Sequence, residues 1–100
     1  MVKSFLHLGC GRLTKLNSTP EFKNNHWDET RVDIDEKVNP DIVASMTDMS
    51  VIESDKFDAI YSSHNIEHLF AHEVPIALNE MYRVLNDDGY LVITCPDLVS

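Results

Sequence analysis

Two glycines follow the first apolar segment of the sequence, at a spacing suited to holding a ligand against the backbone. Leu6-His7-Leu8 runs directly into Gly9-Cys10-Gly11. Glycine has no Cβ, so the chain can turn sharply there and its peptide groups can approach a ligand closely. A dinucleotide-binding turn would need a third glycine where Thr14 stands, which disfavours NAD and FAD. The motif alone fits either a ligand-binding turn or a plain tight turn.

An acidic residue stands at the distance from this turn that a nucleoside site would use. Asp33 lies at the end of a predicted second strand, about 20 residues beyond Gly11. In doubly wound α/β sheets, an acid at this spacing accepts hydrogen bonds from ribose hydroxyls. Asp35 competes for the role, and an exposed turn acid is the alternative interpretation of Asp33. Together, the turn and the acid indicate a ligand that contains a nucleoside.

A group of histidines offers a second kind of chemistry. His64 and His68 are spaced i, i+4, so a helix would place both on one face, with Glu67 beside them. Either histidine is a candidate base for removing a proton from a substrate, and Glu67 could orient it. The segment also matches H-x-x-E-H, in which two histidines bind zinc and the glutamate acts as base. A structural role, capping or satisfying backbone groups, is the third interpretation.

Composition restricts the partners that such a site could serve. The 100-residue chain is 43% hydrophobic, which suits one domain, residues 1–100, with a core of its own. Eight Lys and Arg against 17 Asp and Glu give a formal net charge of −9, which argues against nucleic acid and anionic membranes. No apolar run approaches the ~18 residues of a spanning helix, and the start lacks a signal-peptide pattern. We expect a cytoplasmic protein with a small-molecule partner.

The sequence predicts five strands and one clear helix that would position these residues. The expected strands cover residues 2–8, 30–34, 42–44, 57–61 and 90–95. The helix, from Val74 to Leu85, has apolar residues at three- and four-residue spacing and ends before a stop signal at Gly89. Strands separated by crossovers indicate an α/β fold with a mostly parallel sheet. The second and third strands are too close for a crossover helix, so a loop is expected between them.

Three bulky side chains are expected to pack rather than to bind a ligand. Met81 and Tyr82 belong to the periodic apolar face of the predicted helix, which places both in the core. Trp27 precedes the second strand, where its indole can bury a large area in the absence of a helix. The sequence therefore predicts Trp27 as a packing anchor.

Five blocks of sequence, in order, resemble class I S-adenosylmethionine-dependent methyltransferases. They are Leu6–Gly11, Trp27 with Val32–Asp35, Asp41–Ala44, Phe57–Leu69 and Glu80–Leu98. The similarity spans residues 5–98 and is strongest to compact members with a Glu-His-Leu segment and a shortened second helix. It implies a Rossmann-like methyltransferase fold with a mostly parallel sheet in the order 3-2-1-4-5, and S-adenosylmethionine as cofactor. In that order Cys10 and Cys95 lie about 9–10 Å apart, beyond disulfide reach, so both are expected to be free thiols.

The resemblance also implies roles for individual residues at the cofactor end. Gly9-Cys10-Gly11 would pass under the methionine part of S-adenosylmethionine, and Asp33 would hold the ribose hydroxyls. Asp48 and Met49 would flank the adenine, with Asp48 accepting a hydrogen bond from its amino group. These residues follow the first, second and third predicted strands.

Further roles concern the acceptor end. Ser63 and His64 would lie near the sulfonium and the methyl acceptor. Methyl transfer from a sulfonium is an in-line displacement, so positioning supplies much of the rate. Only an acceptor that must lose a proton needs a base, and His64, His68 and Glu67 are the candidates.

The sequence departs from the family pattern in three places. His7 stands where the family usually has an acid, and Leu13 stands where a small residue is frequent. The sequence stops at Ser100, whereas family members usually continue through two more strands. The leading expectation is a methyltransferase acting on a small-molecule or glycan-like acceptor. A truncated, non-catalytic S-adenosylmethionine-binding or assembly module is the alternative, and a zinc hydrolase is a third.

The last predicted strand bears on association between chains. Leu91-Val92-Ile93 is apolar on both faces, as in an interior strand, yet only Pro96 to Ser100 follow it. An open apolar edge invites pairing with another chain. We therefore expect a homodimer or higher oligomer that meets through this strand or the helix before it.

Overall fold

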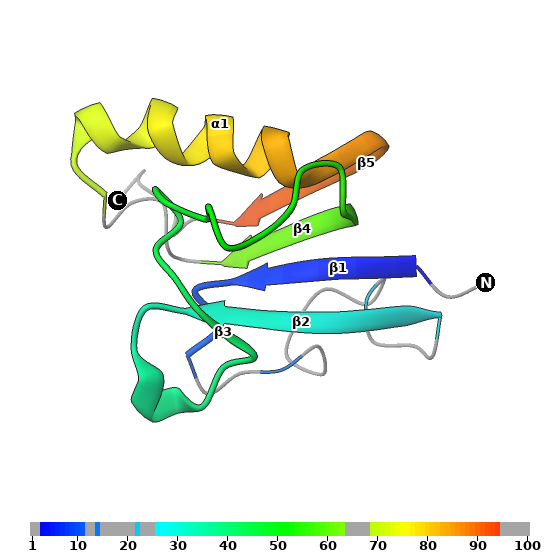
Figure 1. The fold of residues 1–100 in the computed structure, drawn as a ribbon, viewed down its shortest axis with the longest axis horizontal. Helices are drawn as coiled ribbons and strands as arrows, with labels where there is room; N and C mark the ends of the chain where they lie inside the picture. The colour runs from blue at the N-terminus through cyan, green and yellow to red at the C-terminus, as the bar shows by residue number, and fades with distance from the viewer. Residues whose placement is uncertain (1–2, 12–13, 15–21, 23–25, 64–68, 95–100) are drawn as a thin grey trace, which may run out of the picture.

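A computed structural model of the chain shows a five-stranded sheet with a helix packed on one face (Figure 1). It describes residues 3–11, 14, 22, 26–63 and 69–94. The strands are β1 (Lys3–Leu8), β2 (Trp27–Asp33), β3 (Ile42–Val43), β4 (Phe57–Ser63) and β5 (Leu85–Thr94). Helix α1 (Val74–Val84) follows a 3-10 turn, η5 (Ala71–Glu73), and a second 3-10 turn, η3 (Glu36–Val38), follows β2.

The sheet has the order and direction that the sequence predicts. Its strands run β3-β2-β1-β4-β5, and each neighbouring pair is parallel. The predicted α/β Rossmann-like architecture and its strand order are therefore confirmed. Because all strands point the same way, their carboxyl ends meet at one edge of the sheet, where ligands of such folds bind.

The two faces of the sheet are packed differently. On the face that carries α1, the core is mainly aliphatic, and beside Phe57 it includes Leu6, Leu8, Val32, Ile60, Ala77, Met81 and Val84. On the other face, an aromatic cluster is formed by Phe5, Phe22, Trp27, Ala59 and Tyr61. Side chains alternate between the faces along a strand, and β1 is buried on both sides, as expected of a central parallel strand. The burial of Trp27, which is 5% exposed, confirms its role as a packing anchor.

Helix α1 buries a narrower face than its sequence suggests. Ala77, Met81 and Val84 are fully buried, so the prediction for Met81 is confirmed. Tyr82 is 82% exposed, so its placement in the core is wrong. Adjacent helical residues point about 100° apart, and the turn that directs Met81 into the core directs Tyr82 away from it.

Gly89 has a different role from the predicted helix stop. The helix ends at Val84, and Leu85 follows it in an extended conformation, so Gly89 already lies within β5. A Cβ at Gly89 would lie 2.9 Å from Leu85 Cδ2 and 3.1 Å from the Phe57 carbonyl oxygen. The pairing of β4 with β5 is irregular at this point. Glycine is therefore required by close packing against β4.

The short connection between β2 and β3 contains no α-helix. Its 3-10 turn η3 is capped by the Asp35 carboxylate, which accepts a hydrogen bond from the Lys37 amide at 2.9 Å. Asn39 ends the turn in the left-handed conformation, with φ 59°. The expectation of a shortened connection is confirmed.

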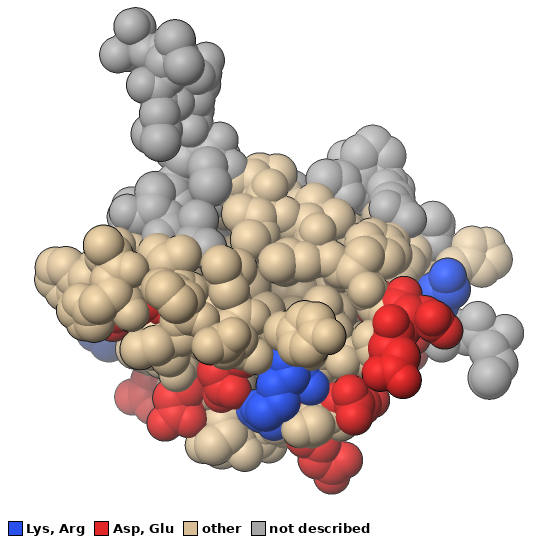
Figure 2. Space-filling model, turned by 90° about the horizontal axis from the view of Figure 1, so that it is seen from above, with Lys and Arg blue, Asp and Glu red and all other residues tan. Residues whose placement is uncertain are grey.

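The surface reflects the acidic composition. On the face covered by α1, acidic side chains gather along one margin, with few basic side chains between them (Figure 2). No helix among the described residues is long and apolar enough to cross a membrane.

Candidate functional site

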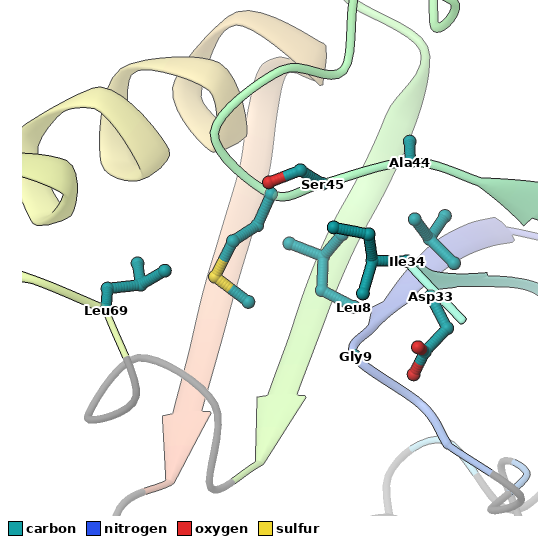
Figure 3. Close-up of a pocket in the computed structure, with 9 residues that line it drawn as sticks. Leu8, Gly9, Asp33, Ile34, Ala44, Ser45 and Leu69 are labelled. Atoms are coloured by element: carbon teal, nitrogen blue, oxygen red, sulfur yellow. The ribbon is translucent and has the colours of Figure 1, made fainter.

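A cavity of about 220 Å³ opens where β1, β2 and β3 end (Figure 3). Its lining residues are Leu8, Gly9, Val32, Asp33, Ile34, Ala44, Ser45, Met46 and Leu69. Most of the wall is apolar, and Asp33 and Ser45 supply polar side chains. The cavity lies at the carboxyl ends of the strands, beside the point where the strand order reverses between β1 and β4.

Gly9, the first residue of the glycine turn, lines this cavity. Gly9 and Gly11 both adopt left-handed backbone conformations, with φ 59° and 57°. Cys10 between them donates its backbone N–H to the Val32 carbonyl at 3.2 Å, which ties the turn to β2. No atom of the described chain lies within 4 Å of a Cβ built at Gly11, so conformation rather than crowding requires glycine there.

Asp33 joins the turn to the end of β2. Its Oδ2 accepts a hydrogen bond from the Gly11 amide at 2.8 Å, and its Oδ1 accepts one from the Asp35 amide at 2.9 Å. Each carboxylate oxygen has a second lone pair, so Asp33 keeps acceptor capacity for a ligand. Asp35, the competing acid, instead caps η3 and does not line the cavity.

Arg31 contacts the same turn from β2. Its Nη2 donates to the Gly11 carbonyl at 2.8 Å, and its Nη1 donates to the Asn39 carbonyl at 3.2 Å. The sequence analysis did not identify this residue. Its two-residue spacing from Asp33 places both side chains on one face of a strand, but the spacing does not show that Arg31 bonds backbone carbonyls.

The thiol between the two glycines is protected from reaction. Cys10 is 1% exposed, and burial raises the pKa of its thiol, an effect that the nearby Arg31 charge partly opposes. A raised pKa keeps the group as an unreactive thiol. Cys10 is a free cysteine, as predicted, whereas Cys95 lies outside the described residues.

Two residues that the resemblance places beside the adenine lie away from the cavity. Met49 is fully buried in the aliphatic core, where its amide donates to Glu80 Oε1 at 2.7 Å. Asp48 is exposed, and hydrogen bonds from the Ser50 hydroxyl and amide lower the pKa of its carboxyl group. The methionine that reaches the cavity is Met46, close to the end of β3.

Part of the predicted acceptor end falls outside the described structure. His64, Glu67 and His68 are not among the described residues. Ser63 ends β4, and its Oγ accepts a hydrogen bond from Thr94 Oγ1 at 2.7 Å, away from the cavity lining. The described ranges contain no group of three or more His, Cys, Asp or Glu residues placed to hold a metal ion.

Most of the cavity wall was not predicted from the sequence. The apolar Ile34, Ala44 and Met46, and the polar Ser45, line the cavity because they stand at or just after the ends of β2 and β3. The sequence could have indicated them only by their position after predicted strands, since the carboxyl ends of parallel strands share one edge of the sheet. Leu69 comes from the segment before η5, and no local pattern marks it.

Comparison with protein families identifies the class to which this fold and site belong. A family model described as a methyltransferase domain matches residues 4–93. The chain therefore belongs to the class I methyltransferase-domain family, whose cofactor is S-adenosylmethionine. A search of the curated protein sequences found no match.

Solved structures show the same fold. A protein from Pyrococcus horikoshii is 21% identical with a TM-score of 0.81, and the match covers 98% of this chain and 48% of that one. A SAM-dependent methyltransferase from Archaeoglobus fulgidus is 23% identical with a TM-score of 0.77, and the match covers 99% and 47%. A Burkholderia thailandensis 1,6-didemethyltoxoflavin-N1-methyltransferase, solved with that compound and S-adenosylhomocysteine, is 16% identical with a TM-score of 0.70, covering 92% and 44%. The chain thus spans about half the length of these proteins.

Proposed function

We propose that this chain binds S-adenosylmethionine in the cavity at the end of β1, β2 and β3, as the cofactor-binding part of a methyltransferase. One observation carries the proposal. Gly9 and Asp33, which lie far apart in the sequence, line the same cavity, and Asp33 holds the amide of Gly11 at 2.8 Å. A left-handed glycine turn next to a strand-terminal acid is the arrangement that a nucleoside ligand requires.

The chemistry of the lining fits the parts of that cofactor. The remaining acceptor capacity of Asp33 suits two ribose hydroxyls, and Ile34, Ala44 and Met46 offer an apolar wall for a purine. The backbone from Gly9 to Gly11 would face the methionine part. The cavity is smaller than the ~300–1,000 Å³ that encloses a whole drug-sized ligand, so these residues would hold the nucleoside portion.

The reaction asks mainly for positioning. S-adenosylmethionine supplies an activated methyl group on a sulfonium. The chain's own residues would hold the nucleoside and so direct the methyl toward an acceptor held in line. We propose a small-molecule or glycan-like acceptor. If it must lose a proton, His64 or His68 would accept it, with Glu67 orienting the imidazole and Ser63 lying nearby.

We also propose that two copies of the chain associate through β5. This strand lies at one edge of the described sheet, and its apolar residues pack against the clusters on both faces. Leu91 and Ile93 pack on the aliphatic cluster and Val92 on the aromatic one, yet all three remain partly exposed. Sedimentation at micromolar concentration is expected to show a dimer or larger species. A stable species of 11.4 kDa would contradict this.

Calorimetric titration with S-adenosylmethionine and S-adenosylhomocysteine tests the binding proposal. We expect one molecule to bind per chain, so the heat of binding should reach its plateau at a 1:1 ratio. A folded protein that binds neither compound would overturn the proposal. Metal analysis of the same sample addresses the H-x-x-E-H alternative, since stoichiometric zinc would favour a hydrolase.

A further inference from the structure

We infer that Arg31 is a positioning residue for the cofactor, because its guanidinium holds the glycine turn and the β2–β3 connection in one arrangement. The inference rests on the proposed binding of S-adenosylmethionine. It assigns to Arg31 no contact with the cofactor itself. Its effect would be exerted through Gly11 of the glycine turn and through Asn39 of the β2–β3 connection, two residues that do not themselves line the cavity.

Two side chains of β2 hold Gly11, one at its amide and one at its carbonyl. Arg31 and Asp33 are alternate residues of β2 and share a face of the sheet, and Arg31 is in register with His7 of β1. Asp33 accepts the Gly11 amide at 2.8 Å, and Arg31 donates to the Gly11 carbonyl at 2.8 Å. These two groups belong to the two peptide planes that flank the Gly11 Cα. Two side chains of one strand therefore fix both planes of a residue whose φ is 57°.

Arg31 also holds the connection that follows β2. The Arg31 guanidinium donates to the Asn39 carbonyl at 3.2 Å, and the Arg31 backbone amide donates to Asp41 Oδ2 at 2.7 Å. This connection carries the chain from Asp33 into β3 and on to the apolar wall at Ala44 and Met46. Arg31 thus ties the glycine turn to the segment that leads to the opposite wall.

The chemistry of arginine explains why one side chain can do both. The guanidinium is a planar fork with five donors, so it can bind two carbonyls that lie in different directions. A lysine ammonium is a compact point charge on a flexible stem, and it holds such a pair less well. Hydrogen bonds from a charged donor are also stronger than neutral ones. Arg31 is only partly buried, so these hydrogen bonds form without a large desolvation cost for the guanidinium.

A matched control is available in the same molecule. Arg83 donates to two backbone carbonyls, those of Met49 at 2.8 Å and Ile52 at 2.9 Å. It also bonds Glu80 on its own helix at 2.8 Å and does not line the cavity. Replacing either arginine removes hydrogen bonds of the same kind. Only the Arg31 replacement loosens the glycine turn.

The test compares the wild type with Arg31→Met, Arg31→Lys and Arg83→Met. S-adenosylhomocysteine affinity is measured by calorimetry, and Tm by thermal unfolding. We expect Arg31→Met to weaken binding about 10- to 100-fold, the scale of lost charged hydrogen bonds. Compared with Arg31→Met, Arg31→Lys is expected to restore Tm toward the wild-type value more fully than it restores affinity. If Arg31→Met does not fold, Arg31→Lys serves as the test. Arg83→Met is expected to lower Tm while affinity stays within about threefold.

A further measurement separates this inference from the proposed function. Hydrogen exchange of the Gly11 amide, followed by NMR without ligand, is expected to be faster in Arg31→Met and unchanged in Arg83→Met. Unchanged Gly11 exchange, or equal loss of affinity in both Met variants, would overturn the role of Arg31. A wild type that does not bind S-adenosylhomocysteine would overturn the proposed function, while the exchange result would still show whether Arg31 holds the turn.

Discussion

Asp33 and Asp58 show the same hydrogen-bonding pattern at opposite ends of the sheet, since each carboxylate accepts two hydrogen bonds from N–H groups. At the carboxyl end, Asp33 accepts the Gly11 amide at 2.8 Å and the Asp35 amide at 2.9 Å. At the amino end, Asp58 near the start of β4 accepts the Ser4 amide at 2.9 Å and the Asn86 side-chain amide at 2.6 Å. Each carboxylate therefore joins separate segments of the chain and is well supplied with donors.

The surroundings of the two carboxylates differ. Asp33 borders a largely apolar cavity of about 220 Å³, beside two glycines in left-handed conformations. A second cavity, of about 140 Å³, lies near the amino end and is lined by Asp55, Tyr82 and Asn86 among others, but not by Asp58. Hydrogen bonding alone does not distinguish a functional acid from a structural one. Its position at the strand ends and the neighbouring glycine turn are what favour the proposed cofactor role for Asp33.

The largest difference in ligand affinity is expected between substitutions of two glycines, Gly11 at the carboxyl end of the sheet and Gly89 near its amino end. Gly11→Val places a β-branched residue at φ 57°, in a conformation that such residues rarely adopt, so the turn beside the proposed ligand must change shape. We expect S-adenosylhomocysteine binding to fall below detection by calorimetry.

Gly89→Ala is the control for that change. Its Cβ would lie 3.1 Å from the backbone carbonyl oxygens of Asn86 and Phe57, so we expect a loss of about 1–3 kcal/mol in unfolding free energy from overpacking. The affinity of the folded protein should be unchanged. A Gly11→Val protein that folds and binds normally would show that the turn has no part in the site.

The next largest effect is a loss of stability when Asp58 is replaced. Asp58→Ala leaves the Ser4 amide and the Asn86 side chain without their acceptor, and we expect a loss of about 1–3 kcal/mol in unfolding free energy. Denaturant unfolding measures the loss, and calorimetry should show unchanged S-adenosylhomocysteine affinity. A marked loss of affinity would mean that the two ends of the sheet are not independent.

A smaller effect is expected when the pH is lowered. Hydrogen bonds from the Ser4 amide and the Asn86 side chain lower the pKa of Asp58, so its contribution is complete above the unfolded pKa, about 3.9. The contribution is lost as the pH falls through the lower, folded pKa. Wild type should therefore lose more stability on acidification below about pH 4 than Asp58→Asn does. Parallel stability curves for the two proteins would contradict this account of Asp58.

The sequence predicted the features that depend on local spacing. The short β2–β3 connection and the position of Asp33 at the end of β2 follow from apolar periodicity and from turn residues, whereas the strand order came from the family resemblance. The start of β2 was missed by three residues. Trp27 begins the strand because it packs against Phe5 and Phe22, and these aromatic contacts join distant parts of the sequence.

The features that were missed depend on tertiary packing. Apolar periodicity did not show that α1 meets the sheet through Met81 and not Tyr82, because the two residues are adjacent in the sequence. Likewise, Met46 and Met49 both follow β3, and only the packing of α1 against Met49 decides which one reaches the cavity. Arg31 was missed because its partners are backbone carbonyls, which no side-chain motif reveals.

The most direct test of the central claim is calorimetric titration of S-adenosylhomocysteine into wild type, Asp33→Ala and Asp58→Ala. If Asp33 holds the ribose, its replacement should weaken binding by about 1–3 kcal/mol, roughly 5- to 150-fold, because a buried polar partner is left unpaired. Asp58→Ala should bind within about threefold of wild type, although it unfolds more easily. Equal affinity in all three proteins would contradict the assignment of Asp33 to the cofactor site.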